Sequence, residues 1–258
     1  MAETNHEAPV AVANLCKAFN RQTVLAGLTL NIDSGQTVSV LGRSGTGKSV
    51  LLKLLIGLHK PDSGSVRILG QDIARAGPKQ LNEVRKRVGF LFQQAALYDS
   101  LTVAGNVDFP LSRHSKMPDA ERKDKVRELL ASVGMEKDLE KLPSEISGGM
   151  QKRVGLARAL ALDPEILLFD EPTSGLDPIT ATEICDLIVD LKERRKLTAV
   201  VVTHDLRGAR LFSDRFVLIH QGKSVIEGTF DDLRKSRNAL VTQFLANGEE
   251  VMSCPHSE

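Results

Sequence analysis

The sequence has few cysteines, and none of them is placed for a metal or redox site. Cys16, Cys185 and Cys254 are the three cysteines of the 258-residue chain. They are odd in number, lie far apart and form no C-x-x-C pair, the spacing used by zinc sites and dithiol redox motifs. We therefore interpret them as ordinary thiols of a reducing compartment.

The sequence also lacks a long apolar run and a strong net charge. No stretch reaches the about 18 consecutive apolar residues of a membrane span, and residues 1–10 have no apolar core of signal-peptide length. Any membrane association is therefore expected to come through a partner. Lysine and arginine total 34 against 33 for aspartate and glutamate. This balance gives no general reason to attract nucleic acid or anionic lipid, so no nucleic-acid partner is expected.

Patterns along the chain predict an α/β protein. Apolar and polar residues alternate over residues 10–12 and 28–32, which predicts a small antiparallel sheet. A β-rich run at 37–41 leads through a glycine-rich loop to an apolar, buried helix at 50–56. Residues 119–133 have the spacing of an amphipathic helix and predict a helical insert. Strand-like runs at 166–169, 198–202 and 216–219, separated by helical stretches, then predict a parallel sheet, and residues 220–223 a hairpin turn.

Residues 42–49 match the phosphate-binding pattern G-x-x-x-x-G-K-S between a predicted strand and a predicted helix. Glycines let successive backbone N–H groups face phosphates, and the helix N-terminus adds partial positive charge. Lys48 is expected to meet the β and γ oxygens of ATP, and Ser49 to offer its hydroxyl to Mg²⁺. A purely structural glycine-rich turn would not require lysine followed by serine. The predicted nucleotide contacts are Gly42, Arg43, Ser44, Gly45, Thr46, Gly47, Lys48, Ser49 and Val50.

Two adjacent carboxylates follow the predicted strand at 166–169, at the edge where open α/β sheets bind ligands. Asp170 is expected to hold Mg²⁺ through water, and Glu171 to polarise the attacking water. General-base catalysis of this kind contributes roughly 10² to 10⁴ in rate. An acid pair favoured only by a helix dipole is the structural alternative, which the upstream phosphate loop disfavours.

His204 is the one histidine whose position predicts a function. It follows the strand-like run at 198–203, so it should lie at the same sheet edge, near the γ-phosphate. For His204 alone, a structural role would be the simpler interpretation. Its position after a strand in a chain with a phosphate loop favours a functional role instead. The other histidines show no metal-ligand spacing and are expected on the surface or in packing: His6, His59, His114, His220 and His256.

A second glycine-rich helix start lies at residues 147–150. Ser147 is in a favoured N-cap position, and Gly148 and Gly149 leave backbone amides bare. A structural helix start needs only one such residue. The order of the motifs favours a phosphate-binding role for this helix start over a purely structural one. That order is the phosphate loop, Gln93, this helix start, the acid pair, residues 174–177 and His204.

In that order and spacing, the sequence from Phe19 to about Gly228 resembles the ATP-binding subunits of ABC transporters. The resemblance implies that Phe19 stacks on adenine, and that Gln93 touches Mg²⁺ and reports to a membrane subunit. It implies head-to-tail homodimers, with each ATP between the phosphate loop of one subunit and the signature motif of the other. The signature motif is Ser147, Gly148, Gly149 and Met150, and the 174–177 loop, which includes the ATP contact Asp177, joins the two halves. Met150 departs from the family, which mostly has glutamine there.

The implied fold is a P-loop NTPase of ABC type, with a RecA-like parallel sheet, an antiparallel β subdomain and an inserted helical subdomain. The ATPase domain would span 8–246, with 8–94 and 159–246 as the core and antiparallel sheet, and 95–158 as the helical and signature subdomain. Residues 247–258 would form a flexible tail.

A finer resemblance involves residues 92–103, 106–107, 109–111 and 177–180, together with the methionine in the signature. These segments are similar to the ATPases of the Mla and Mce type, which move lipids between bacterial membranes. The implied partners are a membrane permease, a lipid-binding protein with an Mce domain and a small STAS-type protein. The chain would lie at the cytoplasmic face of the inner membrane, held peripherally by the permease, with Tyr98 and Asp99 lining the permease groove.

Two alternatives stay open at the level of the sequence. One is the ATPase of an importer for amino acids or other polar solutes, and another is a non-transport ABC ATPase such as a division-type one. A P-loop kinase is disfavoured because it has no use for the serine-glycine-glycine helix start.

Overall fold

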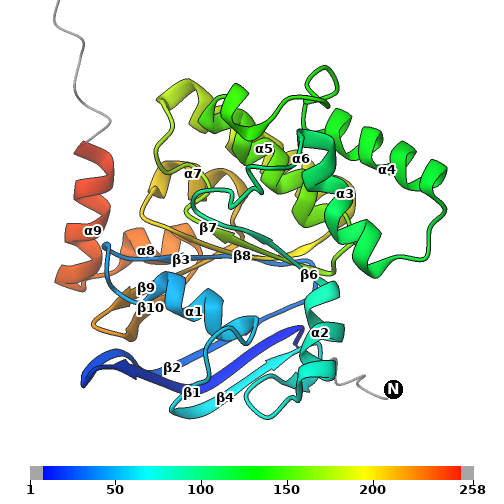
Figure 1. The fold of residues 1–258 in the computed structure, drawn as a ribbon. Coiled ribbons are helices and arrows are strands. Elements are labelled where there is room, and N and C mark those ends of the chain that lie inside the picture. Colours follow the sequence, from blue (N-terminus) through cyan, green and yellow to red (C-terminus); the bar gives the residue numbers. More distant parts are fainter. Residues whose placement is uncertain (1–7, 251–258) are drawn as a thin grey trace, which may run out of the picture. The chain divides into compact units, whose positions relative to one another are not determined.

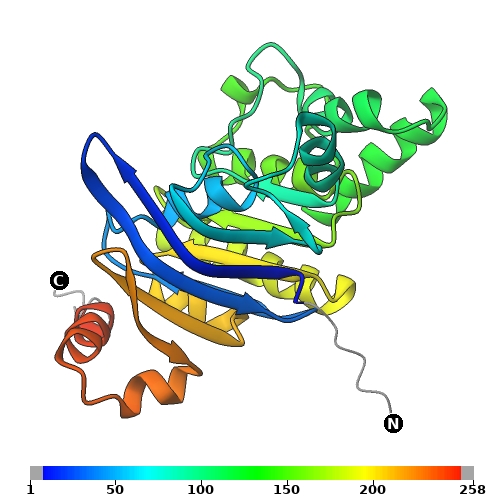
Figure 2. The same ribbon diagram turned by 90° about the horizontal axis from the view of Figure 1, so that it is seen from below.

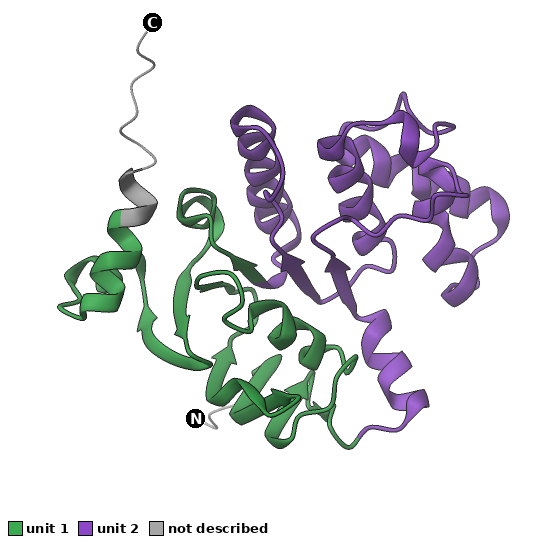
Figure 3. Cartoon of the chain, turned by 60° about the vertical axis from the view of Figure 1, so that its left-hand side comes forward, with its two compact units in different colours: residues 1–75, 201–258 green, residues 76–200 purple. Residues whose placement is uncertain are grey.

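A computed structural model describes residues 8–250 of the chain (Figures 1 and 2). The chain divides into two compact units: unit 1 comprises residues 1–75 and 201–258, and unit 2 comprises residues 76–200 (Figure 3). The limits expected for the helical insert, 95 and 158, both lie within unit 2, and that subdivision stays a prediction. Helix α9 (Ala239–Glu250) includes the first residues of the predicted tail, whereas 251–258 lie outside the described residues.

Unit 1 begins with the predicted antiparallel sheet, coloured blue to cyan in Figure 1. Its strands are β1 (Val10–Phe19), β2 (Gln22–Ile32), β4 (Ser63–Ile68) and β5 (Gln71–Asp72), in the order β2-β1-β4-β5. The alternating residues Val10, Val12, Leu28, Leu30 and Ile32 are all buried. The sequence pattern therefore identified the inward face of β1 and β2 correctly.

The rest of unit 1 carries the phosphate loop. Strand β3 (Thr37–Leu41) pairs in parallel with β9 (Arg215–His220), and β9 forms a hairpin with β10 (Lys223–Gly228). Positive φ at Gln221 and Gly222 makes the hairpin turn that the sequence predicted. Helix α1 (Lys48–Leu55) follows β3 and packs on β4, with Leu51, Leu52, Leu54 and Leu55 buried. The remaining helices are α7 (Leu206–Phe212), α8 (Phe230–Lys235) and α9.

Unit 2 contains a parallel strand pair and most of the long helices. Strand β6 (Val88–Leu91) pairs in parallel with β7 (Ile166–Asp170), and both α2 (Pro78–Lys86) and α5 (Gly148–Leu160) pack on β6. A Cβ at Gly89 would lie 2.4 Å from the carbonyl oxygen of Ala159, so only glycine allows α5 to approach β6 so closely. Helix α6 (Pro178–Arg195) follows, and β8 (Thr198–Thr203) crosses from unit 2 into unit 1.

Three helices of unit 2 pack against one another, drawn in green in Figure 1: α3 (Val103–His114), α4 (Asp119–Ser132) and α5. The apolar spacing in 119–133 predicted α4 correctly, because Val126, Leu129, Leu130 and Val133 are buried. The sequence patterns did not predict α2, α3 or strands β4 to β6. Within residues 8–250, no helix has the length and apolar character needed to cross a membrane.

Candidate functional site

The phosphate loop, residues 42–49, closes around its own lysine. Lys48 is 5% exposed, and its Nζ donates to the carbonyl oxygens of Gly42 at 2.8 Å and Arg43 at 3.2 Å. The loop is tightened by Thr46, whose N–H and hydroxyl both donate to the Arg43 carbonyl. A buried ammonium held by backbone carbonyls is a fixed positive charge at the end of β3.

Two glycines of the phosphate loop are sterically required. A Cβ at Gly42 would lie 2.7 Å from the carbonyl oxygen of Ile219, and one at Gly47 would lie 2.9 Å from Val24. Gly47 also has φ +97, in the left-handed region that side chains disfavour. Close packing at Gly42 and Gly47 therefore requires glycine at both positions, while the predicted role of the glycines, backbone N–H groups that face phosphates, stays a prediction.

The start of α1 fits a polyphosphate. No side chain caps this helix, and no acidic residue lies in its first turn. By contrast, α5, α6 and α7 are capped by the side chains of Ser147, Asp177 and Asp205. A helix start without a capping side chain, beside a buried lysine, presents N–H groups and positive charge together. These residues suit the phosphates of a nucleotide.

Two further predicted residues of unit 1 are accessible. Phe19, at the end of β1, is 38% exposed, and the ring of His59 meets it edge-on with centroids 5.3 Å apart. His59 thus has the packing role expected from the sequence. His204 is exposed and lies directly after β8, one residue before Asp205 caps α7.

Unit 2 holds the predicted acid pair at the carboxyl end of β7. Asp170 and Glu171 are 5% and 7% exposed. Glu171 has φ +48, a left-handed conformation that is rare for a residue with a side chain. Its carbonyl oxygen accepts from the Ser174 N–H at 3.1 Å, the Ser174 hydroxyl at 2.9 Å and Lys152 Nζ at 2.9 Å.

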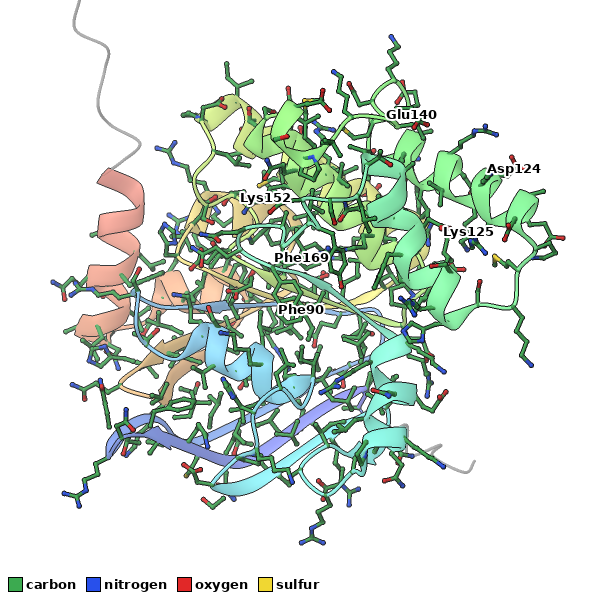
Figure 4. The ribbon with its side chains drawn as sticks, in the orientation of Figure 1. Phe90, Asp124, Lys125, Glu140, Lys152 and Phe169 are labelled. Carbon is green, nitrogen blue, oxygen red and sulfur yellow. The ribbon has the colours of Figure 1, made fainter. Side chains whose placement is uncertain are left out.

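Lys152 is a residue that the sequence analysis did not select. It comes from α5, is 4% exposed and is labelled in Figure 4, as is Phe169 of β7. Burial lowers the pKa of the Lys152 ammonium to about 8, against the opposing pull of the Glu171 and Asp170 carboxylates. The available signal was a lysine in the first turns of the helix that starts with the signature motif, five positions after the N-cap Ser147.

The signature motif, residues 147–150, forms the start of α5. The Ser147 hydroxyl accepts from the Met150 N–H at 3.3 Å, which confirms the predicted cap, and Ser147 and Gly148 are exposed. A Cβ at Gly149 would lie 2.3 Å from the methyl group of Thr180 in α6. The second glycine of the motif is therefore needed for close approach to α6, in addition to any role toward phosphate.

Asp177, the last residue of the 174–177 loop, caps α6. Its carboxylate accepts from the N–H groups of Ile179 and Thr180, each at 3.1 Å, and from the Thr180 hydroxyl at 2.6 Å. The hydroxyl bond and the helix N–H bonds lower the pKa of the Asp177 carboxyl. The Asp177 carboxylate therefore already caps α6. A carboxylate has about four lone-pair sites, so it can accept a further hydrogen bond while it caps the helix.

The segment 92–102, here called the Gln93 loop, follows β6 and exposes Gln93. Ala95 and Ala96 both have left-handed backbones, with φ of +57 and +49. The guanidinium of Arg158, in α5, donates to the carbonyl oxygens of both alanines at 2.6 Å. Burial lowers the pKa of Arg158, and the neighbouring Tyr98 opposes this shift.

Asn106 of α3 fixes the other end of the Gln93 loop. Its side chain is fully buried, accepts from the Tyr98 N–H at 2.8 Å and donates to three carbonyl oxygens at 3.0 to 3.1 Å, those of Tyr98, Leu101 and Thr102. Tyr98 itself is 46% exposed, with its ring 4.6 Å from that of Phe109. The loop therefore presents Gln93 and Tyr98 from a backbone fixed by side chains of α3 and α5.

The chain thus combines a phosphate loop with a buried lysine, a strand ending in two buried acids, and a second glycine-rich helix start. Those features define a nucleoside triphosphatase of the P-loop class. The family model described as ABC transporter matches residues 25–174, and the chain belongs to this family.

Several known proteins are similar over most of the chain. The "Probable ribonucleotide transport ATP-binding protein mkl" of Mycobacterium tuberculosis is 43% identical over 94% of this chain and 67% of its own length. The "Intermembrane phospholipid transport system ATP-binding protein MlaF" of Haemophilus influenzae is 39% identical over 92% of this chain and 89% of its own length. A solved dimeric ATP-binding cassette, in a post-hydrolysis state with ADP and Pi, has a TM-score of 0.79 and 36% identity, covering 85% of this chain and 98% of that one.

These similarities confirm the predicted fold class and activity. The chain is an ATP-binding and ATP-hydrolysing subunit of the ABC transporter type, built on the α/β fold of the P-loop NTPases.

Proposed function

We propose that this chain hydrolyses MgATP to drive lipid transport, phospholipid transport above all, through a partner permease of a bacterial membrane. The observation that carries the proposal is the similarity to MlaF, which extends over nearly the whole of both chains. The mycobacterial relative named for ribonucleotide transport is matched over a smaller part of its own length. The Mla-like segment 92–103 also largely coincides with the Gln93 loop, the part of unit 2 that several side chains hold in place.

The nucleotide site follows from the phosphate loop and the acid pair. Lys48 and the amides of residues 42–50 would bind the phosphates, while Ser49, Gln93 and Asp170 would hold Mg²⁺. Mg²⁺ takes few protein ligands and completes its shell with phosphates and water. The ion would neutralise charge on the phosphates. Glu171 would activate the attacking water, with His204 near the γ-phosphate.

Dimerisation would complete each site. Phe19 would stack on adenine, and the signature and Asp177 of the second protomer would close over the phosphates in a head-to-tail homodimer. Two helix starts, α1 and α5 of opposite protomers, can share the charge of one triphosphate. Hydrolysis would remove a bridging phosphate, so the dimer would open, and that movement would drive the permease.

The remaining partners follow from the same resemblance. We propose a membrane permease that docks on the Gln93 loop near Tyr98 and Asp99, an Mce-domain lipid-binding protein and a small STAS-type protein. The chain would then lie at the cytoplasmic face of the inner membrane, attached through the permease.

The test is purification of the tagged full-length chain from membranes, followed by assay of the recovered complex. We expect a permease and an Mce-domain protein to co-purify, and the reconstituted complex to move a fluorescent phospholipid between vesicles when MgATP is added. The matched Glu171→Gln variant should recover the same partners, bind ATP as a closed dimer and move no lipid. Recovery of an amino-acid or sugar permease instead, or of division proteins without a permease, would refute the lipid proposal.

A further inference from the structure

The backbone of Glu171 is held in a conformation that its own residue type disfavours. A glutamate at φ +48 brings its Cβ against its own backbone, and such residues persist only where the surroundings over-determine them. The adjoining strand β7 fixes the chain before Glu171, and residues 172–174 turn sharply after it. The position of the carboxylate therefore depends on what holds this peptide.

Three donors converge on the carbonyl oxygen of Glu171. Two come from Ser174, three residues along the chain, and are local features of the turn. The third is Lys152 Nζ at 2.9 Å, which comes from α5, and the same ammonium lies 3.5 Å from the Ser174 hydroxyl. Lys152 is thus a contact from another element that reaches both Glu171 and the turn after it.

Lys152 is buried close to the acid pair, where a lysine is energetically costly. The ammonium is 4% exposed, and both neighbouring acids, Asp170 and Glu171, interact with its charge. Burying a charged lysine lowers the stability of the fold unless partners compensate the charge. A lysine whose only role was to fill this space would therefore be unfavourable here. A methionine would fill the same volume without that cost.

Lys152 also lies on the helix that begins with the signature motif. It lies four positions after Gly148, and the first turn of α5 is capped by Ser147. Any shift of the signature along α5 would be transmitted to the Glu171 peptide. In the proposed head-to-tail dimer, the signature of one protomer faces one ATP while Glu171 of that protomer serves the other ATP.

We propose that Lys152 is a positioning residue for ATP hydrolysis: it fixes the peptide that carries Glu171 and ties that peptide to the signature helix. This inference rests on the proposed role of Glu171 as the general base. In the dimer it gives a route by which ATP bound at the signature sets the position of the base at the other site. Hydrolysis at the two sites is then linked through Lys152.

The experiment measures ATP turnover of the full chain in Lys152→Met, Lys152→Gln and Lys152→Arg. We expect Lys152→Met to lower kcat by about 10- to 100-fold, because small misplacements of a catalytic group have effects of this size. The Kd for a non-hydrolysable ATP analogue should stay within about 2-fold, and the Hill coefficient for ATP should fall toward about 1. Lys152→Arg and Lys152→Gln keep an N–H donor and should recover part of kcat.

Arg153→Met is the matched control on the same helix. Arg153 donates to the Val133 carbonyl and to Glu183, and its removal alters α5 without touching Glu171. We expect it to keep the kcat and Hill coefficient of the wild-type chain. Equal losses in Arg153→Met and Lys152→Met would overturn the positioning role, as would wild-type kcat in Lys152→Met.

A second route covers the case in which Lys152→Met does not fold. Ser174→Ala removes a donor to the same carbonyl from a partly exposed loop. It should lower kcat while the Kd for the ATP analogue is retained, and unchanged kcat would contradict the inference. Glu171→Gln separates the two proposals. If that variant still turns over ATP, the base assignment fails, whereas loss of turnover in Glu171→Gln beside normal Lys152→Met refutes only the role of Lys152.

Discussion

The phosphate loop in unit 1 and the Gln93 loop in unit 2 both require left-handed backbone, and they obtain it in different ways. The phosphate loop places glycines there, Gly45 and Gly47, where no side chain resists the conformation. The Gln93 loop places Ala95 and Ala96 there, and Arg158 holds both carbonyls from positions 63 and 62 residues away. The first conformation is determined locally, whereas the second depends on the packing of α5.

The energetic consequences differ accordingly. A left-handed alanine costs about 1–2 kcal/mol, and a hydrogen bond from a charged donor contributes about 1.5–3 kcal/mol. Arg158 of α5 therefore offsets the strain at Ala95 and Ala96, whereas the phosphate loop is held by hydrogen bonds from its own residues, Lys48 and Thr46. Mutations in the phosphate loop and in the residues that hold the Gln93 loop should therefore have different effects.

The largest effect is expected at the phosphate loop. Lys48→Ala removes the buried ammonium and should lower ATP turnover by at least about 10²-fold, the scale of losing one preorganised electrostatic contact. Phosphate release measured at saturating ATP is the assay. Lys60→Ala, an exposed lysine after α1, should keep normal turnover. A Lys48→Ala chain with most of its activity would refute the site assignment.

Arg158→Met is the corresponding test of the Gln93 loop. It should lower the free energy of unfolding by about 2 kcal/mol, since two charged hydrogen bonds are lost while the burial cost of the guanidinium disappears. Urea unfolding followed by circular dichroism measures this change. Arg127→Met, which removes an exposed arginine paired with Asp124, should change stability by less than about 0.5 kcal/mol. Equal effects of both variants would contradict the role of Arg158 in holding the Gln93 loop.

Ser147→Ala sharpens the contrast between the two helix starts, because α5 is capped by a side chain and α1 is not. Loss of the cap should cost about 1 kcal/mol of unfolding free energy. Ser147→Asp, which can accept the same Met150 N–H, should retain most of that stability. Thermal unfolding of the two variants side by side is the measurement, and an unaffected Ser147→Ala would show that the cap contributes nothing.

The smallest effect is expected at Ala96. Ala96→Gly should raise the unfolding free energy by about 0.5 kcal/mol, because relief of the left-handed strain outweighs the added flexibility of the unfolded chain. In the Arg158→Met background the same change should recover part of the lost stability. A destabilisation by Ala96→Gly in urea unfolding would instead show that the alanine backbone carries no strain.

The sequence predicted those features that local residue types determine. Residues 42–49, strand β3, helix α4 and the Ser147 cap all follow from short patterns. Helix α3 was missed because Pro110 and Gly105 interrupt its pattern, and β6 has only four residues. The roles of Lys152, Asn106 and Arg158 were also missed, because each depends on carbonyl groups brought near by folding. Asn106 left a signal, since asparagine is unfavourable inside a helix and usually needs a specific partner there.

The contact between Gly149 and Thr180 has a consequence for movement. The methyl group of Thr180 occupies the space that a side chain at position 149 would need. The hydroxyl of the same threonine donates a hydrogen bond to the Asp177 carboxylate. One small residue therefore braces the first turn of α5 against the bend that leads into α6. Because Thr180 fills the space between them, we expect the signature and the start of α6 to move together.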